Sequence, residues 1–151
     1  MPNELNRQFR EMMAAKDLLV YMRSHIESHD DPHIKSGQTI LIVEDNQTVV
    51  QVVQNYLGFE GFNCITAMTG EEVMQVVNHV DLVVMDISLP GINGLDIVRA
   101  MRLVGFKVPV IVMSAFQDFE HDAMAAGANA TLKKTEVTGL ADLIRSLLGS
   151  I

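Results

Sequence analysis

The chain has 151 residues, of which 48% are hydrophobic, and a formal net charge of −8 at pH 7; these values suit one domain with a full hydrophobic core. Its apolar runs, such as residues 108–116, are much shorter than the roughly 18 residues that a transmembrane helix needs, so we expect no membrane span. We also expect no direct binding of nucleic acid, because residues 38–151 carry only six Lys and Arg, too few for a basic face.

The N-terminal region predicts a single amphipathic helix over residues 1 to about 28. Its apolar side chains recur at spacings of seven, three and four, which is typical of one helix face: Leu5, Met12, Ala15, Leu19, Met22 and Ile26. Residues 28–37 are polar, contain Pro32 and Gly37, and show no periodicity, so we interpret them as a linker. The sequence therefore divides into an N-terminal helix and linker, residues 1–37, and a main domain, residues 38–151.

The predicted N-terminal helix cannot bury its apolar stripe by itself. We expect it to form a homodimer or to dock on a partner, with packing on its own domain as the alternative. Residues 1–37 carry five Lys and Arg against six Asp and Glu, so the helix lacks the basic face of one that lies on a membrane.

From Gln38 onward, short apolar runs alternate with helical patterns, which indicates repeated β-α units and a parallel sheet. The expected strands are residues 39–43, 63–67, 82–85, 108–113 and 130–132. The expected helices are residues 46–58, 70–78, 94–104, 116–126 and 139–148. Right-handed connections place helices on both faces of the sheet, which predicts an α/β, doubly wound, flavodoxin-like domain with strand order 2-1-3-4-5.

Three carboxylates follow two of the expected strands. Asp86 ends the apolar run 82–85 and precedes a turn, so we expect it to be presented at the surface rather than buried. Glu44 and Asp45 follow the run 40–43 in the same way, and parallel strands that end together bring all three to one edge. Clustered carboxylate oxygens of this kind suit Mg²⁺.

Four motifs stand in order at the ends of successive expected strands. They are Glu44-Asp45-Asn46, then Asp86 with Leu89-Pro90-Gly91 and Gly94, then Ser114-Ala115, then Gly127-Ala128 with Lys134. In this order the chain resembles the receiver domain of two-component response regulators, from about Thr39 to Leu148.

The resemblance implies a phosphorylation switch rather than an enzyme with its own substrate. Asp86 would accept a phosphoryl group from a histidine kinase or phosphotransfer protein. Mg²⁺ would be held by Asp45 and Asp86, by Glu44 through water, and by the backbone carbonyl of Ser88.

Two further residues match the family pattern at the phosphoryl group. Lys134 would meet its oxygens, and Ser114 would donate a hydrogen bond to it. Lys133 is the rival for the first role, and we choose Lys134 because the family places this lysine seven residues after the glycine that is Gly127 here.

The sequence departs from the family pattern at two positions near the lysine. Thr131 stands where receivers usually carry Tyr or Phe, so the usual output motion is expected to be altered. Thr135 stands where a proline commonly follows the lysine, so we expect either a trans bond that reshapes the loop or retained strain. Phe116, two residues past Ser114, is expected to exclude water and to slow autodephosphorylation.

The expected last helix is followed almost at once by Ile151, so we expect output through a downstream protein or the N-terminal segment. Whether the chain is a piece of a longer protein is left open. With Cys64 as its only cysteine the chain forms no intrachain disulfide, and the cytoplasm is the expected location.

Two other functions remain as alternatives. One is an aspartate-nucleophile phosphohydrolase, which usually needs a second acid at the position that Ser88 occupies here. The other is a receiver-like module that binds partners without phosphate, and Thr131 and Thr135 make it worth testing.

Overall fold

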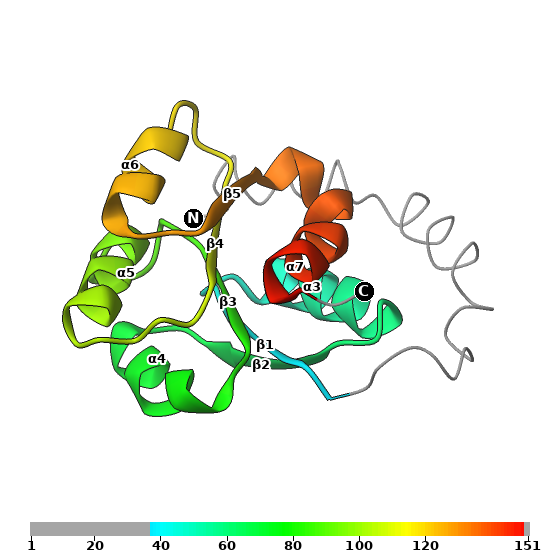
Figure 1. Ribbon diagram of the computed structural model, residues 1–151. Coiled ribbons are helices and arrows are strands. Elements are labelled where there is room, and N and C mark those ends of the chain that lie inside the picture. Colours follow the sequence, from blue (N-terminus) through cyan, green and yellow to red (C-terminus); the bar gives the residue numbers. More distant parts are fainter. Residues whose placement is uncertain (1–36, 150–151) are drawn as a thin grey trace.

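The computed structural model describes residues 37–149, in which five parallel strands form one sheet (Figure 1). The strands are β1 Thr39–Val43, β2 Asn63–Ala67, β3 Leu82–Met85, β4 Val110–Ser114 and β5 Ala130–Lys133. Their order across the sheet is β2-β1-β3-β4-β5, and every neighbouring pair is parallel. The predicted fold class and strand order are therefore confirmed for the main domain.

Helices cover both faces of the sheet. They are α3 Gln47–Phe59, α4 Gly70–Val76, the 3₁₀ segment η2 Val77–His79, α5 Gly94–Leu103, α6 Glu120–Ala126, the 3₁₀ segment η3 Lys134–Gly139 and α7 Leu140–Leu148. In Figure 1, α3 and α7 lie on one side of the sheet, and α4, α5 and α6 lie on the other. None of the helices within residues 37–149 is long and apolar enough to cross a bilayer.

The predicted N-terminal helix lies outside the described residues. The domain boundary near Gly37 therefore stays a prediction, as does dimerisation through residues 1–28.

The hydrophobic core has two halves, one on each face of the sheet. Successive side chains of a strand point to opposite faces, so β1 divides its four buried residues between the halves. Ile40 and Ile42 pack toward α3 and α7, whereas Leu41 and Val43 pack toward α4, α5 and α6. Burial on both faces explains why the central strands are continuous apolar runs rather than alternating ones.

Two asparagines cap the helices that follow β1 and β3 in the chain, α3 and α5. The side-chain oxygen of Asn46 accepts a hydrogen bond from Val49 N at 3.0 Å, and that of Asn93 accepts one from Leu95 N at 2.7 Å. These caps satisfy backbone donors that the first turn of each helix leaves free.

The prediction that a helix begins at Phe116 was wrong. Ser114 belongs to β4, residues 115–118 form bends, and α6 begins only at Glu120. The cause is local, because Asp118 adopts a left-handed φ of 55°, which no right-handed helix accommodates. Phe119 then turns into the core, where only 5% of it is exposed.

Strand β4 also begins two residues later than predicted. Pro109 has no N–H to give to a sheet, although its carbonyl still accepts a hydrogen bond from Val83 N at 2.9 Å. The first full pairing with β3 is therefore that of Val110 with Val83.

Candidate functional site

The three predicted carboxylates meet at the carboxyl edge of the sheet. Strands β1 and β3 are neighbours with Val43 opposite Met85, so the next residues, Glu44 and Asp86, leave the sheet side by side. One carboxylate oxygen each of Glu44, Asp45 and Asp86 lies within 4.8 Å of the others. Within residues 37–149 this is the one group of three or more acidic, His or Cys side chains with the spacing of a metal site.

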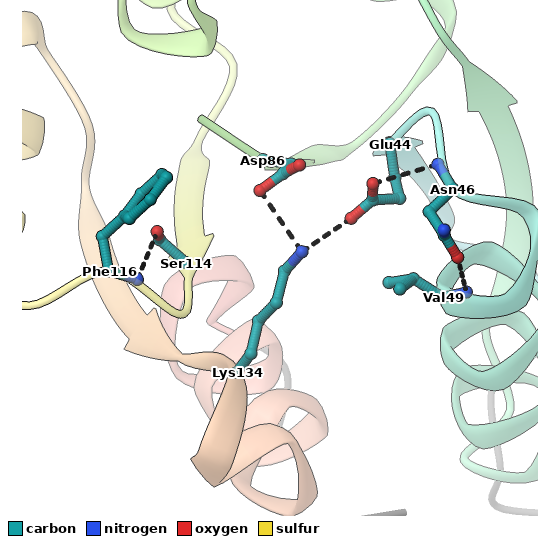
Figure 2. Close-up of polar contacts among 7 residues, drawn as sticks. All are labelled: Glu44, Asn46, Val49, Asp86, Ser114, Phe116 and Lys134. Carbon is teal, nitrogen blue, oxygen red and sulfur yellow. Dashed lines mark hydrogen bonds and ion pairs between the residues drawn. The ribbon is translucent and has the colours of Figure 1, made fainter. Parts of the chain in front are cut away.

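Lys134 follows β5, the strand at one edge of the sheet, and its side chain reaches the carboxylates that follow β1 and β3. Ser114 pairs with Lys133 across β4 and β5, so Lys134 stands one residue beyond the paired strands. Its Nζ lies 2.8 Å from Glu44 Oε1 and 3.3 Å from Asp86 Oδ1, between the two carboxylates (Figure 2). Lys133, the rival in the sequence, is exposed to solvent.

Asp86 is buried, so the expectation that it is presented at the surface was wrong. Only 4% of Asp86 is exposed, and Glu44 and Lys134 are buried as well. On the backbone side, Gly94 approaches so closely that a Cβ there would overlap the carbonyl oxygen of Asp86.

Burial controls the protonation of the two buried carboxylates. Removal from water raises the pKa of Glu44 to about 7, although the nearby Lys134 ammonium works in the opposite direction. Burial also raises the pKa of Asp86; Lys134 lowers it in part, and the charge of Asp45 adds to the rise. Burial therefore disfavours the charged forms of both carboxylates, and Lys134 compensates only in part.

One atom of the cluster has no hydrogen-bond partner. Asp86 Oδ2 is the single buried side-chain nitrogen or oxygen within residues 37–149 without one. An unpaired buried carboxylate oxygen is costly unless a ligand or cation meets it. The residues present thus fit Mg²⁺, which binds a few carboxylates and keeps several waters.

Ser88 lies in the loop after β3, and Ser114 is the last residue of β4. Ser88 is exposed, and the hydrogen bond that closes its loop runs from Gly94 N to the carbonyl of Ile87 at 2.8 Å, not to that of Ser88. Ser114 is buried at the end of β4, where its Oγ accepts a hydrogen bond from Phe116 N at 3.0 Å. Half of the Phe116 residue, 49%, is exposed beside the site.

Thr131 and Thr135 are the two positions near the lysine that depart from the family pattern. Thr131 is half-buried within β5. No peptide bond in the described part of the chain is cis, and the backbone after Lys134 continues directly into η3.

Two residues of the sequence motifs, Asn46 and Gly94, shape the site in ways that the sequence did not assign to them. Asn46 fixes the side chain of Glu44 as well as capping α3, because its N–H donates to Glu44 Oε2 at 3.1 Å. Gly94 allows α5 to approach the backbone carbonyl of Asp86, and the sequence showed only that a glycine stands at this place in the motif.

A model of the family described as the response regulator receiver domain matches residues 40–145. The chain belongs to this family. Receiver domains are the signalling switches of two-component response regulators, and they interact with histidine kinases or phosphotransfer proteins.

Individual relatives agree with this assignment. The response regulator SaeR of Staphylococcus aureus strain USA300 is 36% identical over 99 residues, which are 63% of this chain and 43% of SaeR. The chain therefore spans less than half the length of that curated relative.

Solved structures match over most of the described residues. A putative response regulator from Chloroflexus aurantiacus has a TM-score of 0.69 and 29% identity, covering 76% of this chain and 99% of its own. The BeF₃-activated N-terminal receiver domain of Klebsiella pneumoniae RstA has a TM-score of 0.67 and 27% identity, covering 74% of this chain and 98% of its own.

Proposed function

We propose that Asp86 is the phosphoacceptor of this receiver and that the donor is a histidine kinase or a phosphotransfer protein. The observation that carries the proposal is the unpaired Oδ2 of Asp86, buried beside Glu44, Asp45 and Lys134. A bond would form between a carboxylate oxygen of Asp86 and phosphorus while the bond from phosphorus to the donor's imidazole nitrogen breaks. The imidazole leaves, and Asp86 becomes an aspartyl phosphate.

Lys134 and Ser114 are the protein groups that stabilise the transferred phosphoryl group. The Lys134 ammonium already lies 3.3 Å from Asp86 Oδ1, so it can pair with phosphoryl oxygens without a large movement. The Ser114 hydroxyl accepts from Phe116 N, which leaves its own hydrogen free to be donated to an oxygen on phosphorus.

Mg²⁺ is the proposed cofactor, held by Asp45 and Asp86, by Glu44 through water, and by the backbone carbonyl of Ser88. When bound, this cation offsets the charge that accumulates between the carboxylates and the incoming phosphoryl group. Glu44 has a second task, because it holds Lys134 Nζ at 2.8 Å.

The proposed output is phosphorylation-dependent binding to a downstream protein in the cytoplasm, without direct contact to nucleic acid or membrane. The acidic composition supports this, since the chain carries 19 Asp and Glu against 11 Lys and Arg. The predicted N-terminal helix is the proposed homodimer or partner contact, and its apolar stripe is the reason.

Intact mass after incubation with acetyl phosphate and Mg²⁺ tests the proposal. We expect the parent to gain one phosphoryl group and Asp86→Asn to gain none. Asp96→Asn is the matched control, because Asp96 is exposed on α5, where it pairs with Arg99, and this variant should be phosphorylated like the parent.

Two results would contradict this function. Sustained turnover of a small phosphate ester that depends on Asp86 would instead indicate a phosphohydrolase. No mass gain with either acetyl phosphate or phosphoramidate would indicate a module that acts without phosphate.

A further inference from the structure

The segment that carries Lys134 has little of its own to hold it in place. Segment η3, Lys134–Gly139, is a six-residue 3₁₀ helix whose backbone is interrupted at Glu136, with φ −114° and ψ 26°. Lys133 precedes it and provides no side-chain cap. Short 3₁₀ segments have poor hydrogen-bond geometry, so the position of η3 must come from contacts with the rest of the domain.

The buried phenol of Tyr56 on α3 provides such a contact. Tyr56 is 0% exposed, and its hydroxyl donates to the carbonyl of Thr138 in η3 at 2.8 Å. The same hydroxyl accepts a hydrogen bond from Ala141 N, in the first turn of α7, at 3.0 Å. Gly139 precedes α7 without a side-chain cap, so Tyr56 supplies a cap from 85 residues away in the sequence.

Segment η3 is thus held at both ends. At its far end, Val137 is buried in the same hydrophobic cluster as Tyr56, and Thr138 is hydrogen-bonded to the phenol. At its near end, the Lys134 ammonium enters the carboxylate cluster, with only 2% of the residue exposed. Lysine has a long, flexible side chain, so the backbone must place it closely for its ammonium to lie between two carboxylates.

We infer that Tyr56 is a positioning residue for Lys134, acting through η3, and that its hydroxyl sets the rate of phosphoryl transfer to Asp86. The inference rests on the proposed function of Asp86. Loss of the hydroxyl frees the Thr138 carbonyl and the Ala141 N–H, and the start of η3 moves relative to Glu44 and Asp86. A displacement of about 1 Å in a catalytic group can cost on the order of a hundredfold in rate.

The alternative is that Tyr56 only stabilises the fold. A purely structural residue would lower the unfolding temperature in every background and would not interact with Lys134 in the kinetics. A positioning residue would lose its kinetic effect once Lys134 is gone.

A double-mutant cycle separates these roles. The rate constant of phosphorylation by acetyl phosphate is measured for the parent, Tyr56→Phe, Lys134→Ala and the double variant, all below their unfolding temperatures. We expect Tyr56→Phe to slow the parent about tenfold and to change the Lys134→Ala background less than twofold, with coupling judged as non-additivity. Equal slowing in both backgrounds, or no slowing in the parent, would overturn the inference.

Ile144→Val is the matched control. Ile144 is buried on α7 in the same cluster as Tyr56, but its side chain makes no hydrogen bond. Removal of one methyl group there should lower stability and leave the phosphorylation rate unchanged. A slowing equal to that of Tyr56→Phe would assign the effect to stability and overturn the inference.

A second measurement does not need phosphorylation at all. With limiting acetyl-N-hydroxysuccinimide, peptide mapping compares acetylation of buried Lys134 with that of its exposed neighbour Lys133. We expect Tyr56→Phe to raise the Lys134 to Lys133 ratio about threefold or more, because local burial slows the reaction of an amine. An unchanged ratio would overturn the inference, whereas a parent that takes up no phosphoryl group while the ratio rises would contradict only the proposed function.

Discussion

Strand β3 has an aspartate at each end, and the two differ in almost every physical respect. Asp81, before its first residue, is exposed and accepts a hydrogen bond from Thr39 N at 2.7 Å, while its own N–H donates to the Thr39 carbonyl at 2.8 Å. Asp86, after its last residue, is buried and has one oxygen with no hydrogen-bond partner.

The difference teaches how a sheet edge becomes a reactive site. At the amino edge, a neighbouring strand offers a backbone N–H, and the carboxylate is satisfied in an ordinary structural role. At the carboxyl edge, Asp86 meets two more carboxylates and one lysine, so its charge is offset only in part by Lys134, and a bound cation or a proton can offset the rest. Residue type and strand are the same, and the surroundings decide the chemistry.

The largest expected contrast is in stabilisation by Mg²⁺. With the cation at about 100 times its Kd, linkage predicts a rise of about 2.7 kcal/mol in the free energy of unfolding of the parent. Asp45→Asn should lose most of that rise and Asp81→Asn should keep it, since Asp81 lies at the opposite edge. Urea titrations with Mg²⁺ and with EDTA, at matched ionic strength, give the values. Equal losses in the two variants would contradict the metal site.

The next contrast is the pH dependence of stability without divalent cations. The pKa of Glu44 is raised from 4.5 to about 7 in the folded protein. The folded state therefore holds a proton that the unfolded state has lost, and the free energy of unfolding falls as pH rises from about 4.5 to about 7. We expect Glu44 to contribute about 2 kcal/mol of this fall.

Glu44→Gln should remove that slope, and Asp81→Asn should leave it in place. Urea titrations in EDTA at pH 5 and pH 8 measure the difference between each variant and the parent. Parallel profiles for the parent and Glu44→Gln would show that burial does not raise this pKa.

A smaller effect is expected at Phe116, whose N–H donates to Ser114 Oγ beside the site. Phe116→Glu replaces an apolar barrier with a group that can orient water, so the aspartyl phosphate should hydrolyse about tenfold faster. The half-life is measured by intact mass after removal of donor. Met124→Glu is the control, since Met124 is 49% exposed, as is Phe116. Equal acceleration in both variants, or none at Phe116, would rule out the barrier.

The smallest effect is expected at Asp81 itself. Asp81→Ala removes one exposed hydrogen bond to Thr39 N, so the free energy of unfolding should fall by about 1 kcal/mol. Phosphorylation should be unaffected. A change in phosphorylation rate would mean that the two ends of β3 are coupled.

The sequence was sufficient for what depends on local pattern. Three of the five strands, β1, β2 and β3, have the predicted bounds, and two of them, β1 and β3, are buried apolar runs that end at a charged residue. The meeting of Glu44, Asp45 and Asp86 followed from parallel strands that end at one edge. Phe116 was assigned to a helix because the pattern holds no sign of the left-handed Asp118.

What the sequence could not provide depends on groups that are distant along the chain. Buried Asp86 lies 3.3 Å from the ammonium of Lys134, which follows β5. The partners of the Tyr56 hydroxyl are backbone atoms 82 and 85 residues away. Every residue type has a backbone carbonyl, and every type except proline has a backbone N–H, so the sequence cannot show which of them Tyr56 binds.

The ion pair between Lys134 and Glu44 joins residues 90 positions apart, and it has a consequence for how the domain is made. During synthesis β1, β3 and β4 emerge before β5, so the acidic edge exists for a time without the buried ammonium of Lys134. Closure of so long a loop is entropically costly and comes late. Under the function proposed for Asp86, a chain whose β5 has not docked would not be phosphorylated.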